Sequence, residues 1–117
     1  MLSKQDEIAL RDILYHIDLA IHFIDGFNYA TFRDDIRTVY AVTRCLEIIS
    51  EASRRLSMEV KVRHPSIAWR QMAGAGNIYR HDYEDVAPAF VWETLERDLP
   101  PLRAVMEHEL ALGDNRQ

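Results

Sequence analysis

Apolar residues recur at helical spacing over the first quarter of the chain. They lie three or four positions apart at Leu10, Ile13, Leu14, Ile17 and Ile21. This spacing places them on one face of an α-helix. Ser3 and Asp6 form a plausible start signal before the run, and Gly26 ends it. The pattern predicts a long amphipathic helix between Ser3 and Gly26.

A second apolar stripe follows after a short gap. Its members are Ile36, Val39, Leu46, Ile49 and Leu56, and they continue to about Ser57. Residues 31–34 (Thr-Phe-Arg-Asp) repeat the helix start signal, so the second helix is predicted to begin there. Two long helices joined by a short turn should pack antiparallel.

The second half of the chain contains shorter apolar runs separated by proline and glycine. Pro65 breaks the chain, and Ser66 is a candidate cap for a third helix through Trp69 and Met72. Residues 73–76 (Ala-Gly-Ala-Gly) are poor helix material, because each interior glycine costs roughly 1 kcal/mol relative to alanine. Close approach of the backbone to another helix or to a ligand would justify them.

Proline also marks the last predicted helices. Pro88 suits the first turn of a fourth helix, which Pro100 and Pro101 must kink or end before apolar spacing resumes at Leu102. Strand alternation and internal repeats do not occur. We therefore expect an all-α, antiparallel bundle of four to five helices, formed by residues 1–117 as one domain. Its long apolar stripes also favour a homodimer.

Charge and cysteine content narrow the class of protein. The formal net charge is −5, which argues against sequence-blind adhesion to nucleic acid. Bases gather at Arg54, Arg55, Lys61 and Arg63, whereas residues 82–117 hold nine acids against three arginines. The bases fit either solvated helix ends or a local patch for a phosphate backbone. The chain has acids near its start and no long uncharged run, and its one cysteine, Cys45, is expected to be buried. These features predict a soluble, cytoplasmic protein with no membrane partner.

Residues 77–85 form the densest group of functional side chains. Asn77 and His81 are four apart and share a helix face, whereas Arg80 points about 100° away from His81. Histidine exchanges protons near neutral pH, so His81 is a candidate general acid or base. The alternative is an ordinary histidine at a helix end, stabilised by the helix dipole.

Two other groups of polar side chains are candidate sites. His16 and His22 fall on different faces of one helix, so we expect no metal site there and no cofactor. Glu47 and Glu51 are one turn apart with Arg44 nearby, which fits surface ion pairing or the lining of an active site.

Several segments together resemble the HepT-like branch of the HEPN superfamily. They are residues 44–52, 67–74, 77–83, 91–93 and 98–100. The resemblance implies a helical, metal-independent ribonuclease that is the toxin of a bacterial toxin–antitoxin pair. It also implies a homodimer in which two sets of arginine and histidine meet to act on RNA.

The family motif reads arginine-asparagine, three residues, histidine, one residue, tyrosine. Asn77, His81 and Tyr83 match it, but Gly76 stands at the arginine position. Arginine supplies a forked donor for the charge that develops on phosphate, which glycine lacks. Arg80 is the nearest replacement in sequence and would need a helix break after Gly76 to face His81. An arginine from the second subunit is the other possible source.

The resemblance gives Tyr83 a role of its own. In related pairs a small nucleotidyltransferase antitoxin adds AMP to the tyrosine of this motif, which blocks the site with charge and bulk. Tyr83 could instead be a packing aromatic. Two other hypotheses differ from the toxin. One is a HEPN-derived binding module, for RNA or protein, that lost cleavage with its arginine. The other is a structural helical adaptor.

Overall fold

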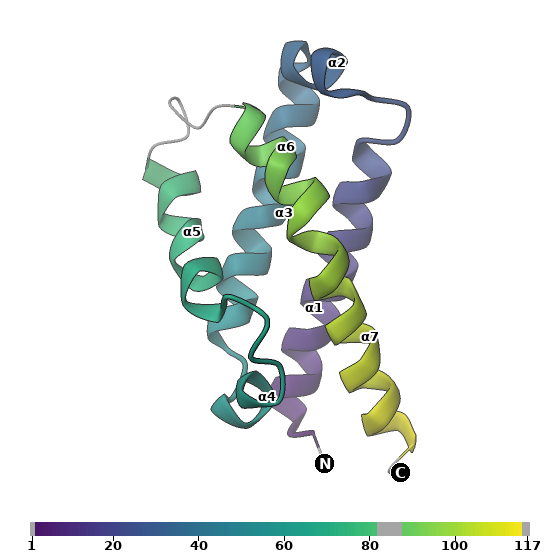
Figure 1. Cartoon of the computed structure of the whole chain (residues 1–117), viewed down its shortest axis with the longest axis vertical. Helices are drawn as coiled ribbons and strands as arrows, with labels where there is room; N and C mark the ends of the chain where they lie inside the picture. The colour runs from purple at the N-terminus through teal and green to yellow at the C-terminus, as the bar shows by residue number, and fades with distance from the viewer. Residues whose placement is uncertain (1, 82–87, 116–117) are drawn as a thin grey trace.

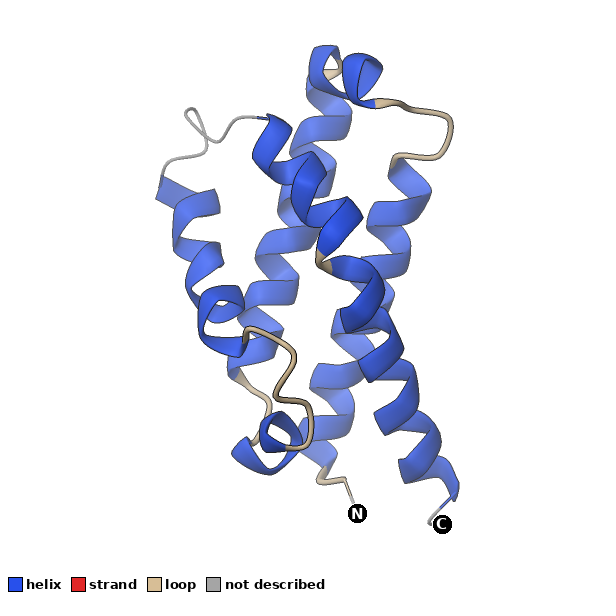
Figure 2. Cartoon of the chain, viewed as in Figure 1, coloured by secondary structure: helices blue, strands red, loops and turns tan. Residues whose placement is uncertain are grey.

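The computed structural model describes residues 2–81 and 88–115. Its elements are α1 (Lys4–Phe23), α2 (Tyr29–Asp34), α3 (Ile36–Arg54), α4 (Met58–Val62), α5 (Trp69–His81), α6 (Pro88–Arg97) and α7 (Leu99–Asn115). The regular elements of the described residues are all helices (Figure 2), which confirms the all-α class. α1 and α3 run antiparallel, α5 lies along α3, and α6 and α7 follow one another across the bundle (Figure 1).

The first helix follows its sequence pattern closely. The Ser3 side chain caps it by accepting a 3.0 Å hydrogen bond from the Asp6 backbone N–H. Leu10, Ile13 and Ile17 are fully buried against α3 and α7. Burying an apolar stripe of this kind is the main source of stability for a helix in a small domain.

The start of the second long helix differs from the prediction. Asn28 caps the short α2 through a reciprocal box with Thr31, and Asp35 then caps α3 by accepting a 3.2 Å bond from the Thr38 N–H. The expectation of one helix starting at residues 31–34 was therefore wrong. The signal at Thr31 belongs to a capping box that starts at Asn28, three residues earlier.

A short helix that the apolar pattern did not predict joins α3 to the next element. Ser57 caps α4, and Asp6 holds Ser57 by accepting bonds from its N–H at 2.8 Å and from its hydroxyl at 2.7 Å. Five residues are too few to show helical periodicity, so α4 is visible only in the fold. The contact fixes the start of α1 against the end of α3.

The glycine-containing third helix is longer than its composition suggests. α5 begins at Trp69, so the expectation that Ser66 caps it was wrong. The Trp69 indole N–H donates to the carbonyls of Lys61 and His64, which positions the start of the helix. The helix then continues without a break through Gly74 and Gly76 to His81.

The proline positions match their predicted roles. Pro88 is the first residue of α6, and Pro100 and Pro101 lie in the first turn of α7. Backbone N–H groups in the first turn have no acceptor inside the helix, so the N–H that proline lacks costs no helical hydrogen bond there. Cys45 is buried, and burial raises the pKa of its thiol to about 11. A thiol with that pKa stays protonated at neutral pH, so Cys45 is a packing residue. No helix in the described residues is both long and apolar enough to cross a bilayer.

A buried carboxylate joins α7 to the end of α4. Glu109 accepts two bonds from the Arg63 guanidinium, at 3.1 and 2.6 Å, and its Oε2 lies 2.7 Å from His64 Nε2. Its side chain is only 2% exposed. The hydrogen bond from Arg63 is the largest effect on the pKa of Glu109, which is lowered from 4.5 to about 2.

This contact predicts an acid-sensitive contribution to stability. Because the folded state lowers the pKa of Glu109, its contribution is present above pH 4.5 and is lost as pH falls through about 2. Glu109→Gln should reduce the free energy of unfolding at pH 7 by about 2–3 kcal/mol. Urea denaturation should show this gap shrinking toward pH 2.

The matched control is Glu107→Gln on the same helix. Glu107 is 53% exposed and pairs with Arg103, so its removal should cost well under 1 kcal/mol. Equal losses from the two variants, or a Glu109→Gln loss that does not change with pH, would contradict the proposed contribution.

Candidate functional site

One hydroxyl group makes two hydrogen bonds between α3 and α5. Ser50 Oγ donates to the Ala73 carbonyl at 3.1 Å and accepts from the Gly76 N–H at 2.9 Å. Ser50 is 2% exposed, and Gly76 is buried. The hydroxyl therefore joins two positions of α5 that are about one turn apart to the last turns of α3.

The two glycines of α5 have different surroundings. A Cβ atom on Gly76 would lie 2.7 Å from Ser50 Oγ and 3.2 Å from Ser50 Cβ, whereas a Cβ on Gly74 would meet nothing within 4 Å. The expected close backbone approach is confirmed at Gly76. Gly74 faces open space and has no such reason.

An arginine from α3 lies beside the glycine at the motif position. Arg54 donates from Nε at 3.0 Å and from Nη2 at 2.7 Å to the Ala73 carbonyl. Its Nη2 would be 3.9 Å from a Cβ on Gly76. The sequence showed Arg54 only as one of a group of bases, because nothing in the order of residues tells which α3 side chain meets Gly76.

The bases between Ser53 and His64 do not form one continuous patch. Arg54 turns toward α5, Arg55 forms a 3.1 Å bond to Asp12 of α1, and Arg63 turns to Glu109 of α7. Each of these arginines also has a carboxylate within ion-pair distance, Glu51 at 3.7 Å in the case of Arg54. For Arg55 and Arg63, which are hydrogen-bonded to their carboxylates, this arrangement favours the interpretation as paired helix-end charges.

The acidic pair on α3 forms ion pairs along its own helix. Arg44 pairs with Glu47, and Glu51 pairs with Arg54. These pairs fit surface ion pairing, one of the two alternatives that the sequence left open for these residues. Glu51 lies next to the α3–α5 contact through its partner Arg54, whereas Arg44 is exposed and bound to Glu47.

Three of the candidate site residues fall in the last turns of α5. Asn77 and Arg80 are helical positions, and His81 is the last residue of the helix. Tyr83 lies outside the described residues. Because α5 is unbroken, the helix break proposed to turn Arg80 toward His81 is absent, and positions 80 and 81 stay about 100° apart around the axis.

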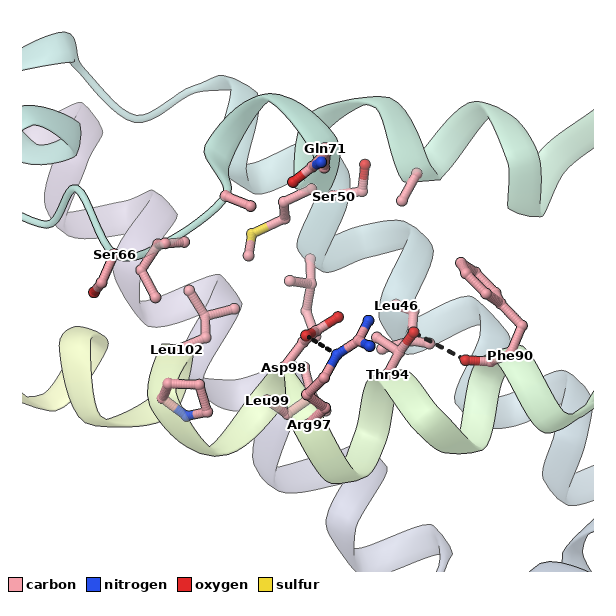
Figure 3. Close-up of a pocket in the computed structure, with 16 residues that line it drawn as sticks. Leu46, Ser50, Ser66, Gln71, Phe90, Thr94, Arg97, Asp98, Leu99 and Leu102 are labelled. Carbon is pink, nitrogen blue, oxygen red and sulfur yellow. Dashed lines mark hydrogen bonds and ion pairs between the residues drawn. The ribbon is translucent and has the colours of Figure 1, made fainter.

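A cavity of about 360 Å³ lies between α3, α5, α6 and the start of α7 (Figure 3). Leu46, Met72 and Leu102 give it a largely apolar wall. Its one cation among the described lining residues, Arg97, is bound to Asp98 at 3.1 Å and to Glu93 at 2.6 Å. The cavity therefore presents apolar surface and a neutralised ion pair, which suit phosphate poorly. Nothing in the order of residues predicts this cavity.

Comparison with known proteins gives consistent matches over most of the chain. Residues 13–109 match the family described as "Ribonuclease HepT-like". A Methanocaldococcus jannaschii protein named "Putative RNase MJ1380" is 34% identical over 107 residues, covering 91% of this chain and 98% of that protein. The "Probable ribonuclease HepT" of Thermococcus cleftensis is 37% identical over 106 residues, covering 91% of this chain and 96% of that protein. No solved structure gives a significant match.

The contact at Ser50 predicts opposite effects on stability for alanine substitutions at the two glycines of α5. Gly76→Ala places a Cβ against Ser50 Oγ and should destabilise the protein by about 1–3 kcal/mol. Gly74→Ala meets no atom and should stabilise the helix by about 0.5–1 kcal/mol. Thermal denaturation of both variants would measure the difference.

The same geometry predicts the effect of restoring the motif arginine. Gly76→Arg must displace Ser50 and also places a second guanidinium near Arg54, so we expect it to destabilise the fold rather than raise activity. A variant Gly76→Arg as stable as the wild type would contradict the close approach.

Proposed function

Because the chain belongs to the family of HepT-like ribonucleases, we propose that it is a metal-independent RNA endonuclease that uses His81 and Asn77. The observation that carries the proposal is the unbroken α5, which keeps Asn77 and His81 one turn apart at the motif spacing. Both residues fall within the matched range of the family.

The proposed chemistry needs two proton carriers and a cation. The ribose 2′-oxygen attacks the adjacent phosphorus, the bond from phosphorus to the 5′-oxygen breaks, and a 2′,3′-cyclic phosphate forms. One His81 takes the proton of the 2′-hydroxyl, and the partner subunit's His81 gives a proton to the departing 5′-oxygen. Asn77 orients the imidazole. A cation stabilises the negative charge that grows on the phosphate oxygens.

The use of two His81 side chains in one reaction requires a homodimer. Large apolar side chains remain exposed on the two longest helices of the bundle, Ile8 and Tyr15 on α1 and Ile36 and Tyr40 on α3. Ile36 is 65% exposed and one turn from Tyr40. Exposed apolar surface of this kind supports association with a second copy.

The proposed biological role is the toxin of a toxin–antitoxin pair in the cytoplasm. Its partner is a minimal nucleotidyltransferase antitoxin that transfers AMP to Tyr83. The added phosphate and nucleoside repel and obstruct RNA at the neighbouring His81. Tyr83 follows His81 by two residues, which places the modification close to the proposed catalytic group.

Gly76 favours a second candidate function. The motif position for arginine carries no side chain and is buried against Ser50. A protein that lost its cation in this way would retain binding to RNA, or to a protein partner, without cleavage. The two candidates differ in whether the wild type produces cleaved RNA.

The cleavage prediction separates them. In excess EDTA the wild type should cut single-stranded RNA and leave 2′,3′-cyclic phosphate ends, and His81→Ala should abolish the reaction. The control His22→Ala removes an exposed histidine of α1 and should leave the rate unchanged. Light scattering on the same sample should give the mass of a dimer. RNA that is bound but uncut supports the binding module, and activity that requires a divalent metal contradicts the mechanism.

The modification prediction uses the proposed partner. Incubated with its nucleotidyltransferase and ATP, the protein should gain mass in units of AMP, and RNA cleavage should fall in proportion. Tyr83→Phe should block both changes, whereas Tyr15→Phe, which alters a tyrosine that is 63% exposed on α1, should block neither. Peptide mass spectrometry locates the modified residue. Labelling that persists in Tyr83→Phe removes this mechanism.

A further inference from the structure

We propose that Arg54 of α3 supplies the phosphate-binding cation that the motif lacks at Gly76. The inference rests on the proposed ribonuclease function and assigns the missing part of that site. It concerns which helix provides the charge: the motif places it on α5, whereas this chain places a guanidinium in the same region from α3.

The position of the guanidinium is the first argument. Arg54 Nη2 would lie 3.9 Å from a Cβ on Gly76, so the charge occupies the space from which a motif arginine would extend. His81 is five residues further along α5, which is roughly 7.5 Å along the helix axis. An arginine side chain is long enough to act over that separation on a phosphate held between the two groups.

The orientation of the guanidinium is the second argument. Nε and Nη2 both donate to the Ala73 carbonyl, which fixes the plane of the group on α5. A guanidinium has five N–H donors, so three remain after these two bonds. Among the described residues the further partner is Glu51, whose carboxylate is 3.7 Å from Nη1. The side chain is 37% exposed, so these donors are open to an incoming phosphate.

The other arginines near α5 fit the role less well. Arg55 turns to Asp12 of α1, and Arg44 is bound to Glu47. Arg80 would need the helix break that the continuous α5 does not contain. The position of Arg54 also agrees with a glycine at position 76. An arginine there would crowd Ser50 and repel the Arg54 guanidinium.

The test compares variants that remove charge and keep size and hydrogen bonding. Arg54→Gln retains a donor for the Ala73 carbonyl but no charge, and we expect kcat for RNA cleavage to fall about 10²–10³-fold. The control Arg55→Gln alters a similarly exposed arginine at the C-cap of the same helix and should change kcat less than about threefold. Thermal denaturation shows whether both variants remain folded at the assay temperature.

Chemical rescue separates a role in charge stabilisation from a structural one. Millimolar guanidinium ion should raise kcat of Arg54→Ala at least tenfold and have no such effect on the wild type or on His81→Ala. Arg54→Lys should recover only part of the rate, because it lacks the planar fork. A loss in Arg54→Gln that follows its melting temperature and resists guanidinium rescue would overturn the proposal.

The outcomes also distinguish this proposal from the function on which it rests. If His81→Ala abolishes cleavage while Arg54→Gln cleaves like the wild type, Arg54 is not the cation and the ribonuclease stands; a larger loss in Arg80→Ala would then assign the role to Arg80. If the wild type does not cleave at all, binding of a 2′-deoxy-substituted RNA decides. Binding at least tenfold weaker in Arg54→Gln than in Arg55→Gln supports a phosphate contact, and equal binding overturns it.

Discussion

The arrangement of α3 and α5 depends on the hydroxyl of Ser50. By donating to the Ala73 carbonyl and accepting from the Gly76 N–H, it brings the two helices closer than a side chain at position 76 would permit. Gly76 is therefore required by packing, even though glycine weakens a helix in isolation. The same approach places the Ala73 carbonyl within reach of Arg54, so one contact sets both the backbone geometry and the position of the charge.

Two polar contacts beyond the end of α3 hold the remaining helices in register with this pair. Asp6 of α1 binds Ser57 at the start of α4, and Glu109 of α7 binds Arg63 after α4. Glu109 is almost fully buried, so its charge is tolerated because Arg63 and His64 supply hydrogen bonds. The family motif lies at the other end of α5, away from these contacts, where the helix ends at His81.

Within the HepT-like ribonuclease family, the proposed site keeps a proton carrier on α5 and takes its cation from α3. Chemistry at a phosphate needs a positive charge at a given place and imposes little on which element delivers it. Gly76 and Arg54 then act as a pair, because the Arg54 guanidinium lies beside the position from which a side chain at residue 76 would extend. In the proposed site, Arg54 takes the role of the motif arginine that is absent at position 76.

The sequence by itself determined the helical class, the cap at Ser3, the helix start at Pro88, and the spacing of Asn77 and His81, because these follow from periodicity and local chemistry. It misplaced the starts of α3 and α5, where capping signals overlap or fall outside the helix, and it did not show the five-residue α4. The partner of Gly76 was decided by tertiary structure alone. Residues 50, 54 and 76 meet only after two helices pack, and contacts 22–26 residues apart leave no trace in local spacing.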